Sequence, residues 1–284
     1  MKVLFIGGGN MAQAFLGGLI AKQFPPGNFA VVDPVLETRS RVAALGVNTH
    51  ASFNAQLLDC DAIVLAVNPQ MMEEAVSPLA SKLTTQHVIS IAAGVGTSSI
   101  ASWLGGVTAP YQSVVRAMPN TPALIRAGIT GLYAAAGVGN AGRSLAETLL
   151  GAVGMTVWFD EEAMLDAVTA VSGSGPAYVF YFIEALEEAA LELGFDAAAA
   201  RLFATQTFLG GAQLVASTTE SPRTLRARVT SKRGTTECAI AAFDKRAMRR
   251  NFIDGVKAAC DRSREIGQEL GAASATPNNA GSAD

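Results

Sequence analysis

The stretch IGGGNMA at residues 6–12 constrains the fold most, because it directly follows a short apolar run near the start of the chain. Gly7, Gly9 and Ala12 match the pattern GxGxxG/A. In that pattern the first glycine allows a tight turn from strand to helix, the second lets a pyrophosphate approach the backbone, and the third small residue lets the helix pack closely on the strand. A helix that begins near Asn10 would direct its unpaired N–H groups at the phosphates. The pattern therefore predicts a dinucleotide-binding β-α-β unit.

An acidic residue, Asp33, stands about twenty residues after Ala12, at the expected end of the second strand. A carboxylate there accepts hydrogen bonds from the adenosine ribose and repels a 2′-phosphate, which favours NAD(H). Arg39 and Arg41 follow on the next expected helix, where they either turn toward a 2′-phosphate or lie in solvent. We expect NADPH or NADH as the coenzyme, with Asp33 in favour of NADH.

Short β-branched runs alternate with helical patterns as far as residue 160. Runs separated by roughly fifteen to twenty-five residues indicate parallel β-α-β units. AIVLAV at 62–67 and VISIAA at 88–93 are apolar at consecutive positions, as strands buried on both faces are. The predicted fold of residues 1–160 is a Rossmann-like, doubly wound α/β sheet. Its strands are expected at 3–6, 30–33, 62–67, 88–92, 113–116, 130–134 and 156–159.

Alanine-rich helical periodicity replaces the β-branched runs from Glu161 onward. The stretch AYVFYFIEAL at 177–186 is apolar around most of a helix, and a domain of roughly 120 residues has difficulty covering such a helix alone. We expect an all-α dimerisation and substrate-binding domain over 161–270, paired with a second copy, and a disordered tail over 271–284. Helices are expected over 161–171, 176–193, 196–217 and 246–268.

Charge and composition exclude several classes of function. The formal net charge is only −3, which leaves no basic surface for nucleic acid or for an anionic membrane. No apolar run has the length of a signal peptide or a membrane span. Cys60, Cys238 and Cys260 are too few for a disulfide framework and indicate reduced thiols in a cytoplasmic protein. With only His50 and His87, neither a histidine-based metal site nor a Ser-His-Asp triad is expected.

Further motifs appear later in the chain: AVNPQ at 66–70, VVRAMPNTPALIRAG at 114–128, SGSGPAYVF at 172–180 and VTSKRGTT at 229–236. Together with IGGGNMA they closely resemble the pyrroline-5-carboxylate reductase family, from about residue 2 to residue 268. The resemblance implies hydride transfer from NAD(P)H to the C=N bond of 1-pyrroline-5-carboxylate, which gives L-proline in the last step of proline biosynthesis. It also implies homodimers that assemble further, commonly into decamers of five dimers.

The resemblance implies that Ser231, Gly234, Thr235 and Thr236 bind the substrate carboxylate through backbone amides and a threonine hydroxyl. The competing interpretation of these residues is a simple helix cap. Thr236 and Ser231 are the catalytic candidates, with Thr236 placed to hydrogen-bond the ring nitrogen. Because the imine is partly protonated near neutral pH, no strong general acid is required. Glu220 is either an electrostatic partner of the iminium or one half of a surface salt bridge.

The expected coenzyme contacts lie at the carboxyl ends of the strands, where open α/β sheets bind ligands. Met118 and Asn120 are also expected to border the substrate, and no metal site is expected. The full set of expected coenzyme residues is Gly7, Gly9, Asn10, Met11, Ala12, Asp33, Asn54, Ala66, Val67, Asn68, Pro69, Ala93, Gly94, Pro119, Asn120 and Thr121.

The chain departs from the family pattern at two places. Asn68 stands where the family usually has lysine, and loss of that charge is expected to weaken NADP(H) binding, in agreement with Asp33. Lys232 and Arg233 stand where the family usually has Pro-Gly. They add two cations beside the carboxylate loop and remove the backbone freedom of glycine.

The N-terminal pattern also fits another kind of enzyme and a protein of another class, a nucleotide-sensing or scaffold protein. A β-hydroxyacid or 6-phosphogluconate dehydrogenase shares the N-terminal pattern but needs a catalytic lysine between the domains, and no lysine occurs between Lys82 and Lys232. A nucleotide sensor without turnover would have no use for the TSxxGTT loop. An assay with NADH, NADPH and pyrroline-5-carboxylate distinguishes the three.

Overall fold

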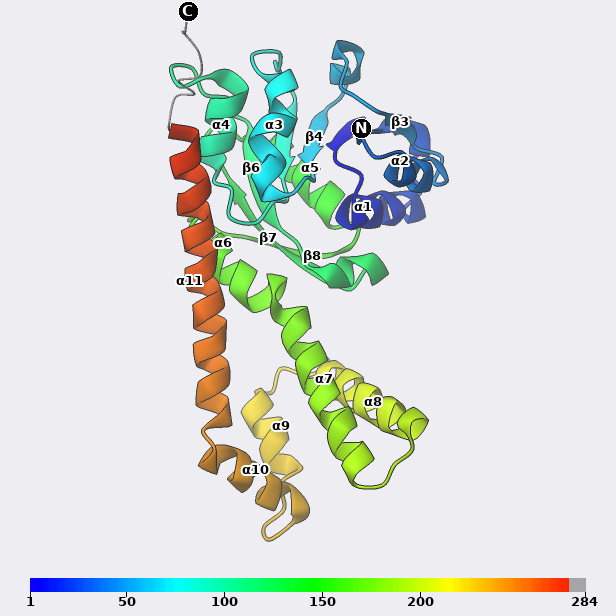
Figure 1. Ribbon diagram of the computed structural model, residues 1–284, viewed down its shortest axis with the longest axis vertical. Coiled ribbons are helices and arrows are strands. Elements are labelled where there is room, and N and C mark those ends of the chain that lie inside the picture. Colours follow the sequence, from blue (N-terminus) through cyan, green and yellow to red (C-terminus); the bar gives the residue numbers. More distant parts are fainter. Residues whose placement is uncertain (276–284) are drawn as a thin grey trace, which may run out of the picture. The chain divides into compact units, whose positions relative to one another are not determined.

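The computed structural model describes residues 1–275 and divides the chain into two compact units (Figure 1). Of the described residues, unit 1 comprises Met1–Gly173 together with 259–275, and unit 2 comprises Ser174–Ala258. The chain therefore crosses between the units twice, and the second crossing falls inside a helix.

Unit 1 is built around one eight-stranded sheet. Its strands are β1 (Val3–Ile6), β2 (Phe29–Val32), β3 (Asn48–His50), β4 (Ala62–Leu65), β5 (His87–Ser90), β6 (Val114–Met118), β7 (Gly128–Ala134) and β8 (Gly154–Trp158). Their spatial order is β3-β2-β1-β4-β5-β6-β7-β8, and β1 to β6 are mutually parallel. The order reverses beside β1, as in doubly wound sheets, and the predicted fold class is confirmed.

Two strands differ from the sequence prediction. The strand β3 was missed because its residues, NTH, carry no β-branched run, and it forms only by pairing with β2. The strand β7 was expected to be parallel but runs antiparallel to β6. Its connection, residues 119–127, contains only the 3₁₀ turn Thr121–Ile125, which is too short for the crossover that a parallel partner needs.

Helices cover both faces of the sheet. Phe5 of β1 packs with Phe15 and Leu149 on one face, whereas Leu4 packs with Met72 and Ile100 on the other. This alternation follows from the two-residue period of a strand, and apolar side chains on both faces make β1 a buried central strand. The helices of unit 1 are α1 (Asn10–Ala21), α2 (Leu36–Ala43), α3 (Met72–Val76), α4 (Thr97–Gly105), α5 (Asn140–Leu150) and α6 (Met164–Val168), which continues as a π-helix (Thr169–Gly173).

The second unit consists of helices. They are α7 (Gly175–Glu192), α8 (Ala197–Ala216), α9 (Pro222–Arg228), α10 (Thr235–Lys245) and the first part of α11 (Met248–Ala275). No helix range was predicted for α9 or α10, because the stretch 218–245 is rich in threonine, serine and arginine. A helix start after the loop 231–236 was implied by its interpretation as a helix cap, and α10 begins there. Within this unit, Phe252 of α11 contacts the rings of Tyr178 and Phe182 of α7.

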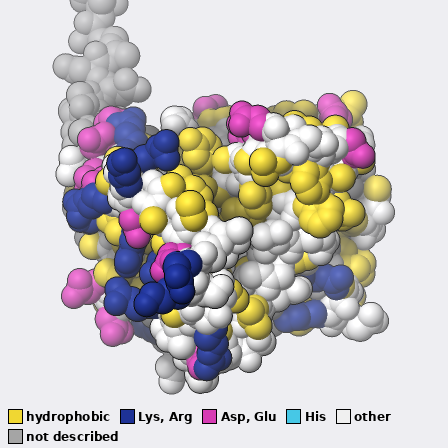
Figure 2. All heavy atoms as spheres, turned by 90° about the horizontal axis from the view of Figure 1, so that it is seen from below, with side chains coloured by type: hydrophobic (Ala, Val, Ile, Leu, Met, Phe, Trp, Pro, Cys, Tyr) yellow, Lys and Arg dark blue, Asp and Glu magenta, His cyan; other side chains and the backbone are white. Residues whose placement is uncertain are grey.

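The long helices of unit 2 expose large apolar side chains. No residue of α7 is buried, and Phe180 and Tyr181 are 65% and 67% exposed. On α8, Leu202 and Phe203 are 59% and 60% exposed. Figure 2 shows apolar side chains in several groups on the face that it presents, with most lysines and arginines at the left and smaller groups at the bottom and lower right. Apolar area of this kind marks an interaction surface.

The expected domain boundaries, after residues 160 and 270, can be compared with the two units of the structure and with the end of α11. The expected boundary after residue 160 lies in the loop behind β8, whereas the first crossing between the units comes later, because α6 still packs on β6 and β7. At the other end, α11 continues to Ala275 through an alanine-rich stretch that favours helix. The expected disordered tail covers 271–284, so its first five residues, 271–275, are helical instead. The rest of that tail lies outside the described residues. Within residues 1–275, no helix combines the length and the apolar character needed to cross a membrane.

Candidate active site

The site begins at the glycine turn between β1 and α1. Gly7 has a φ of +95°, and a Cβ added there would lie 2.5 Å from the carbonyl oxygen of Ala66. Only glycine fits this position. Gly9 is the N-cap of α1, no side chain caps that helix, and its first turn contains no acidic residue. The N–H groups at the start of α1, from Asn10 onward, therefore remain available to an anion.

Two clefts run along the carboxyl edge of the sheet from this turn. The first has a volume of about 520 Å³ and lies over the ends of β1, β2 and β4. The second, of about 310 Å³, lies over the ends of β4, β5 and β6. Both are lined by Ala66, Val67 and Asn68, so they form one groove that crosses the point where the strand order reverses. A groove at this point in a doubly wound sheet is the usual site of a dinucleotide.

Most of the predicted coenzyme residues line this groove. The first cleft contains Gly7, Gly9, Asp33, Ala66, Val67 and Asn68, and the second contains Met11, Pro69, Ala93, Met118, Pro119, Asn120 and Thr121.

Four of the predicted residues do not line either cleft. Asn10 is exposed at the start of α1, and Ala12 is fully buried between that helix and the sheet. Asn54 is exposed, and its side-chain oxygen accepts a hydrogen bond from the N–H of Gln56 at 3.1 Å. Gly94 faces α11 instead. Their binding roles stay predictions.

Sequence reasoning missed several residues of the groove. Phe53 lines the first cleft, but the loop that carries it follows β3, a strand that the sequence did not reveal. Ala92 lines the second cleft and was within reach, because it belongs to the predicted strand VISIAA. Gly173 also lines the second cleft and lies in the motif SGSGPAYVF, which supported the family resemblance but from which no site residue was predicted.

Asp33 lines the first cleft, and Arg39 lies beside it. The Asp33 carboxylate accepts hydrogen bonds from the N–H of Gly8 at 2.8 Å and from the N–H of Val35 at 2.9 Å. The Arg39 guanidinium donates to the carbonyl oxygens of Asp33 and Pro34 at 2.7 and 2.8 Å. Charges of both signs therefore lie together at this place, and Asp33 supports the glycine turn as well as carrying charge. Arg41 is exposed.

Asn120 ties the end of β6 to the start of β7. Its side chain is buried, and its Oδ1 accepts a hydrogen bond from the N–H of Ile129 at 2.9 Å. The amide oxygen is thus engaged within the protein, and the amide nitrogen is the group that remains for a ligand.

The predicted carboxylate loop lies in unit 2, at the amino end of α10. Gly234 is the N-cap of this helix, and no side chain caps it, so the hydroxyls of Ser231, Thr235 and Thr236 are not used as caps. The N–H of Gly234 donates to the carbonyl oxygen of Ser231 at 3.0 Å, which closes a tight turn. An uncapped helix start with nearby hydroxyls suits a carboxylate.

The charged residues around that loop have partners of their own. Arg233 adopts a φ of +60°, and its N–H donates to the carboxylate of Glu237 at 2.6 Å. Glu220 forms a two-pronged ion pair with Arg228, with one contact of 2.6 Å between Oε1 and Nη2. Of the two interpretations left open for Glu220, the structure has the surface salt bridge.

Comparison with known proteins places the chain in a family. Residues 162–266 match the family model for pyrroline-5-carboxylate reductase dimerisation, and residues 2–94 match that for NADP oxidoreductase, coenzyme F420-dependent. A pyrroline-5-carboxylate reductase of Pseudomonas aeruginosa is 42% identical over 272 residues, which cover 95% of this chain and 98% of the relative. The chain belongs to the pyrroline-5-carboxylate reductase family. It is an NAD(P)H-dependent oxidoreductase, and the resemblance seen in the motifs is confirmed.

Solved structures of pyrroline-5-carboxylate reductases are similar over the same length. The enzyme of Coxiella burnetii superposes with a TM-score of 0.84 at 40% identity, over 93% of this chain and 98% of that one. The enzyme of Plasmodium falciparum, solved with NADP bound, has a TM-score of 0.82 at 25% identity, over 94% of this chain and 98% of that one. The predicted coenzyme class, NADPH or NADH, is confirmed for this member of the reductase family.

Proposed function

We propose that this reductase transfers a hydride from NAD(P)H to the C=N bond of 1-pyrroline-5-carboxylate and so produces L-proline, the last step of proline biosynthesis. The observation that carries the proposal is the continuous groove across the carboxyl edge of the sheet, with the glycine turn in its first cleft and small residues in its second. Bound NAD(P)H supplies the hydride, and the protein supplies binding and orientation.

In this proposal the first cleft binds the adenosine half and the second holds the nicotinamide. The N–H groups at the start of α1 bind the pyrophosphate, because that helix end carries neither a side-chain cap nor an acidic residue. Ala93, Met118 and Gly173 bound the nicotinamide end and contribute no nucleophile, which a hydride transfer does not need. Fixing the two reacting carbons at the right distance can lower a barrier by about 7 kcal/mol.

The loop from Ser231 to Thr236 binds the substrate carboxylate through the free N–H groups of α10 and the Thr236 hydroxyl. Its support is the absence of any side-chain cap on that helix. Lys232 and Arg233 are exposed cations beside the loop and attract an anionic substrate. Thr236 hydrogen-bonds the ring nitrogen, and the protonated imine accepts the hydride without a strong acid from the protein.

We further propose that the enzyme accepts both coenzymes and uses NADH more efficiently. Asp33 repels a 2′-phosphate, and Asn68 supplies no positive charge at the position where the two clefts meet. Arg39 opposes this preference, but its guanidinium already donates to two backbone carbonyls.

For the assembly, we propose a homodimer through α7 and α8, with a decamer of five dimers as the complete particle. The exposed aromatic side chains of these helices support the dimer, because such a surface needs a cover in water. Light scattering on the purified protein measures the particle mass directly. We propose a cytoplasmic location away from membranes, in line with three cysteines that are unpaired within the described chain.

The activity test uses purified protein with NADH or NADPH and racemic pyrroline-5-carboxylate, and follows the absorbance of the reduced coenzyme. Oxidation that depends on the imine, with proline as the product, supports the proposal. Reactions with hydroxy acids and keto acids serve as controls. Turnover only with those would indicate a dehydrogenase, and coenzyme binding without any turnover would indicate a sensor.

A further inference from the structure

A buried arginine lies close to the second cleft, and the proposed reaction gives it no role. Arg116 occupies the middle of β6, and its side chain is only 7% exposed. A buried cation is costly unless it is paired. The guanidinium forms ion pairs with Glu162 and Asp166, each with a nitrogen–oxygen distance of 3.3 Å.

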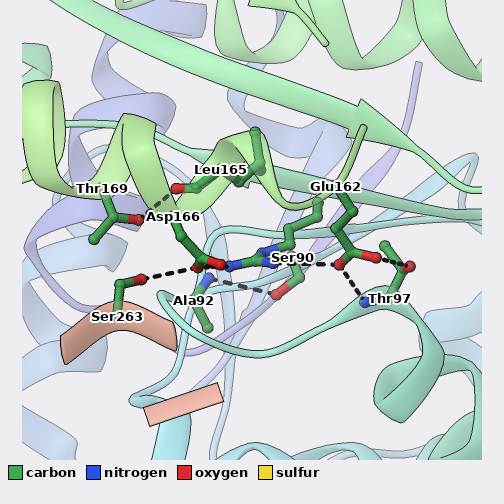
Figure 3. Close-up of polar contacts among 9 residues, drawn as sticks. Ser90, Ala92, Thr97, Glu162, Leu165, Asp166, Thr169 and Ser263 are labelled. Carbon is green, nitrogen blue, oxygen red and sulfur yellow. Dashed lines mark hydrogen bonds and ion pairs between the residues drawn. The ribbon is translucent and has the colours of Figure 1, made fainter. Parts of the chain in front are cut away.

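The two carboxylates extend this pairing to further elements. Glu162 accepts hydrogen bonds from both the N–H and the hydroxyl of Thr97, the first residue of α4, at 2.7 Å each. Asp166 accepts a hydrogen bond from the hydroxyl of Ser263 in α11 at 2.9 Å. Figure 3 shows Ser263 and Thr97 at opposite ends of this line of polar groups, with Asp166 and Glu162 between them. These five residues are here named the Arg116 bridge.

The elements joined by the Arg116 bridge form the walls of the second cleft. Met118 projects from the same face of β6 as Arg116, two residues further on, and lines the cleft. Gly173 lines it too and ends the π-helix that continues from the helix of Asp166. Met118 and Gly173 lie directly against each other, because a Cβ added to Gly173 would lie 2.5 Å from the Cε of Met118.

The opposite wall of the cleft is held by two contacts of the chain that follows it. It consists of Ala92 and Ala93, and the chain then runs through Gly94 to Thr97, which Glu162 holds. Gly94 has a φ of +76°, and a Cβ there would lie 2.8 Å from the side chain of Ile266. Ile266 lies about one helical turn beyond Ser263, so the same part of α11 contacts this wall and the Arg116 bridge.

We propose that Arg116 is a positioning residue for hydride transfer, which sets the width of the nicotinamide end of the groove by tying β6 to the segment that carries Glu162 and Asp166. The inference rests on the proposed function of the cleft. The two carboxylates lie four residues apart, Glu162 in the turn before α6 and Asp166 within α6, and Arg116 joins this segment to β6. Without the cation, two neighbouring carboxylates repel each other and have no partner on β6. Loss of Arg116 therefore lets the walls move apart, whereas the adenosine end, which lies over β1 and β2, keeps its shape.

The first readout is binding affinity, measured for the intact coenzyme and for fragments that lack the nicotinamide, and it does not require turnover. Arg116→Met and Asp166→Asn are expected to weaken the binding of NADPH and NADH about tenfold. They should leave unchanged the binding of 2′-phospho-ADP-ribose and ADP-ribose, which lack the nicotinamide. In the activity assay kcat is expected to fall on the order of a hundredfold, since a misplacement of about 1 Å has effects of that size. Arg116→Lys, which keeps the charge but not the fork of donors, should recover part of both losses.

The matched control, Gln86, directly precedes β5 and so lies at the amino ends of the parallel strands, away from the groove at their carboxyl ends. Gln86 is also buried, at 6% exposed, and its side chain bonds the N–H of Thr84 and the carbonyl oxygen of Leu58 at 2.8 and 2.9 Å. Gln86→Met is expected to lower the unfolding midpoint while kcat and the binding of intact coenzyme stay at the wild-type level.

Three results would overturn the inference. These are wild-type kcat and coenzyme affinity in Asp166→Asn, an equal loss of affinity for coenzyme and fragments, or the same loss of kcat in Gln86→Met. If Arg116→Met does not fold, Asp166→Asn decides by the same criteria. A wild-type protein that fails to reduce the imine would overturn the proposed function alone, because the fragment comparison still tests the Arg116 bridge.

Discussion

The carboxylate of Asp33 accepts a hydrogen bond from the backbone N–H of Gly8, with 2.8 Å between Oδ2 and the nitrogen. The bond joins the end of β2 to the glycine turn, and the second carboxylate oxygen holds the N–H of Val35. We therefore expect the acid to have two effects on coenzyme binding, one through its charge and one through the shape of the turn. Suitable substitutions separate these effects.

Asp33→Asn removes the charge and keeps a hydrogen-bond acceptor. We expect the ratio of kcat/KM for NADPH to that for NADH to rise about tenfold, since a nearby like charge costs on the order of 1 kcal/mol or more. Asp33→Ser shortens the side chain and should, in addition, weaken the binding of both coenzymes. Steady-state kinetics with each coenzyme measure the ratio. The control is Glu37→Gln, an exposed acid on α2, and an unchanged ratio in Asp33→Asn would show that the carboxylate does not face the ribose.

Gly7→Ala and Gly9→Ala form a matched pair in the same turn. At Gly7 the positive φ and the carbonyl oxygen of Ala66 leave no room for a methyl group, so we expect a loss of stability of about 1 to 3 kcal/mol. At Gly9 a methyl group meets nothing within 4 Å, so the fold should keep its stability while the pyrophosphate loses space. Urea unfolding and coenzyme titration measure the two effects. Equal stability of the two variants would contradict the steric argument at Gly7. Normal coenzyme binding by Gly9→Ala would contradict the proposed phosphate site.

Thr236→Ala tests the carboxylate loop. Loss of one hydrogen bond to a charged group, worth about 1.5 kcal/mol or more, should raise KM for the imine or lower kcat about tenfold. The affinity for NAD(P)H should not change, and Thr236→Ser should restore activity. Thr224→Ala is the control within the same unit, because that hydroxyl only pairs with Ser221 at the start of α9. Wild-type kinetics in Thr236→Ala would remove this residue from the site.

Arg233→Gly should stabilise the protein. Arg233 is the third residue of the tight turn closed by Gly234 and Ser231, and its φ of +60° is one that glycine adopts without strain. We expect the free energy of unfolding to rise by about 1 kcal/mol. Lys232→Gly, at a position without a positive φ, should give no gain. Chemical denaturation compares the two, and a stability of Arg233→Gly below that of Lys232→Gly would refute the expectation.

Cys60 should be an unreactive thiol, because burial raises its pKa to about 11. In alkylation experiments from pH 7 to 11, followed by mass spectrometry, its rate should rise only near the top of the range. The same peptide in urea should react with an ordinary midpoint near about 8.5. The unfolded thiol therefore loses its proton first as the pH rises, so the stabilising contribution of Cys60 is complete below about pH 8.5 and is lost toward pH 11. Equal labelling rates with and without urea would contradict this.

The sequence predicted those parts of the fold whose signals are local. The turn from β1 to α1 has one pattern that requires glycine, and the buried strands β4 and β5 have continuous apolar runs. The strand β3 has no such signal, because only its pairing with β2 makes it a strand. The direction of β7 depends on the length of its connection rather than on its own residues, and we judged the strand by its composition.

The candidate site divides in the same way. Residues at the ends of predicted strands, such as Asp33 and Ala66, could be assigned from their positions alone. The carboxylate loop was found by resemblance, since its serine and threonines also fit a helix cap. The Arg116 bridge had no local signal at all, because its members come from four separate parts of the chain and meet only after the sheet, α6 and α11 have packed together.

The first covalent crossing between the two units starts at the second cleft. Gly173, the last residue before the first crossing, lines that cleft, and the return at Ala258–Ala259 comes about one turn before Ser263 in α11. Gly173 therefore belongs both to the lining of the second cleft and to the connection that leads into α7, so a larger side chain there would crowd the cleft at the point where the chain leaves unit 1.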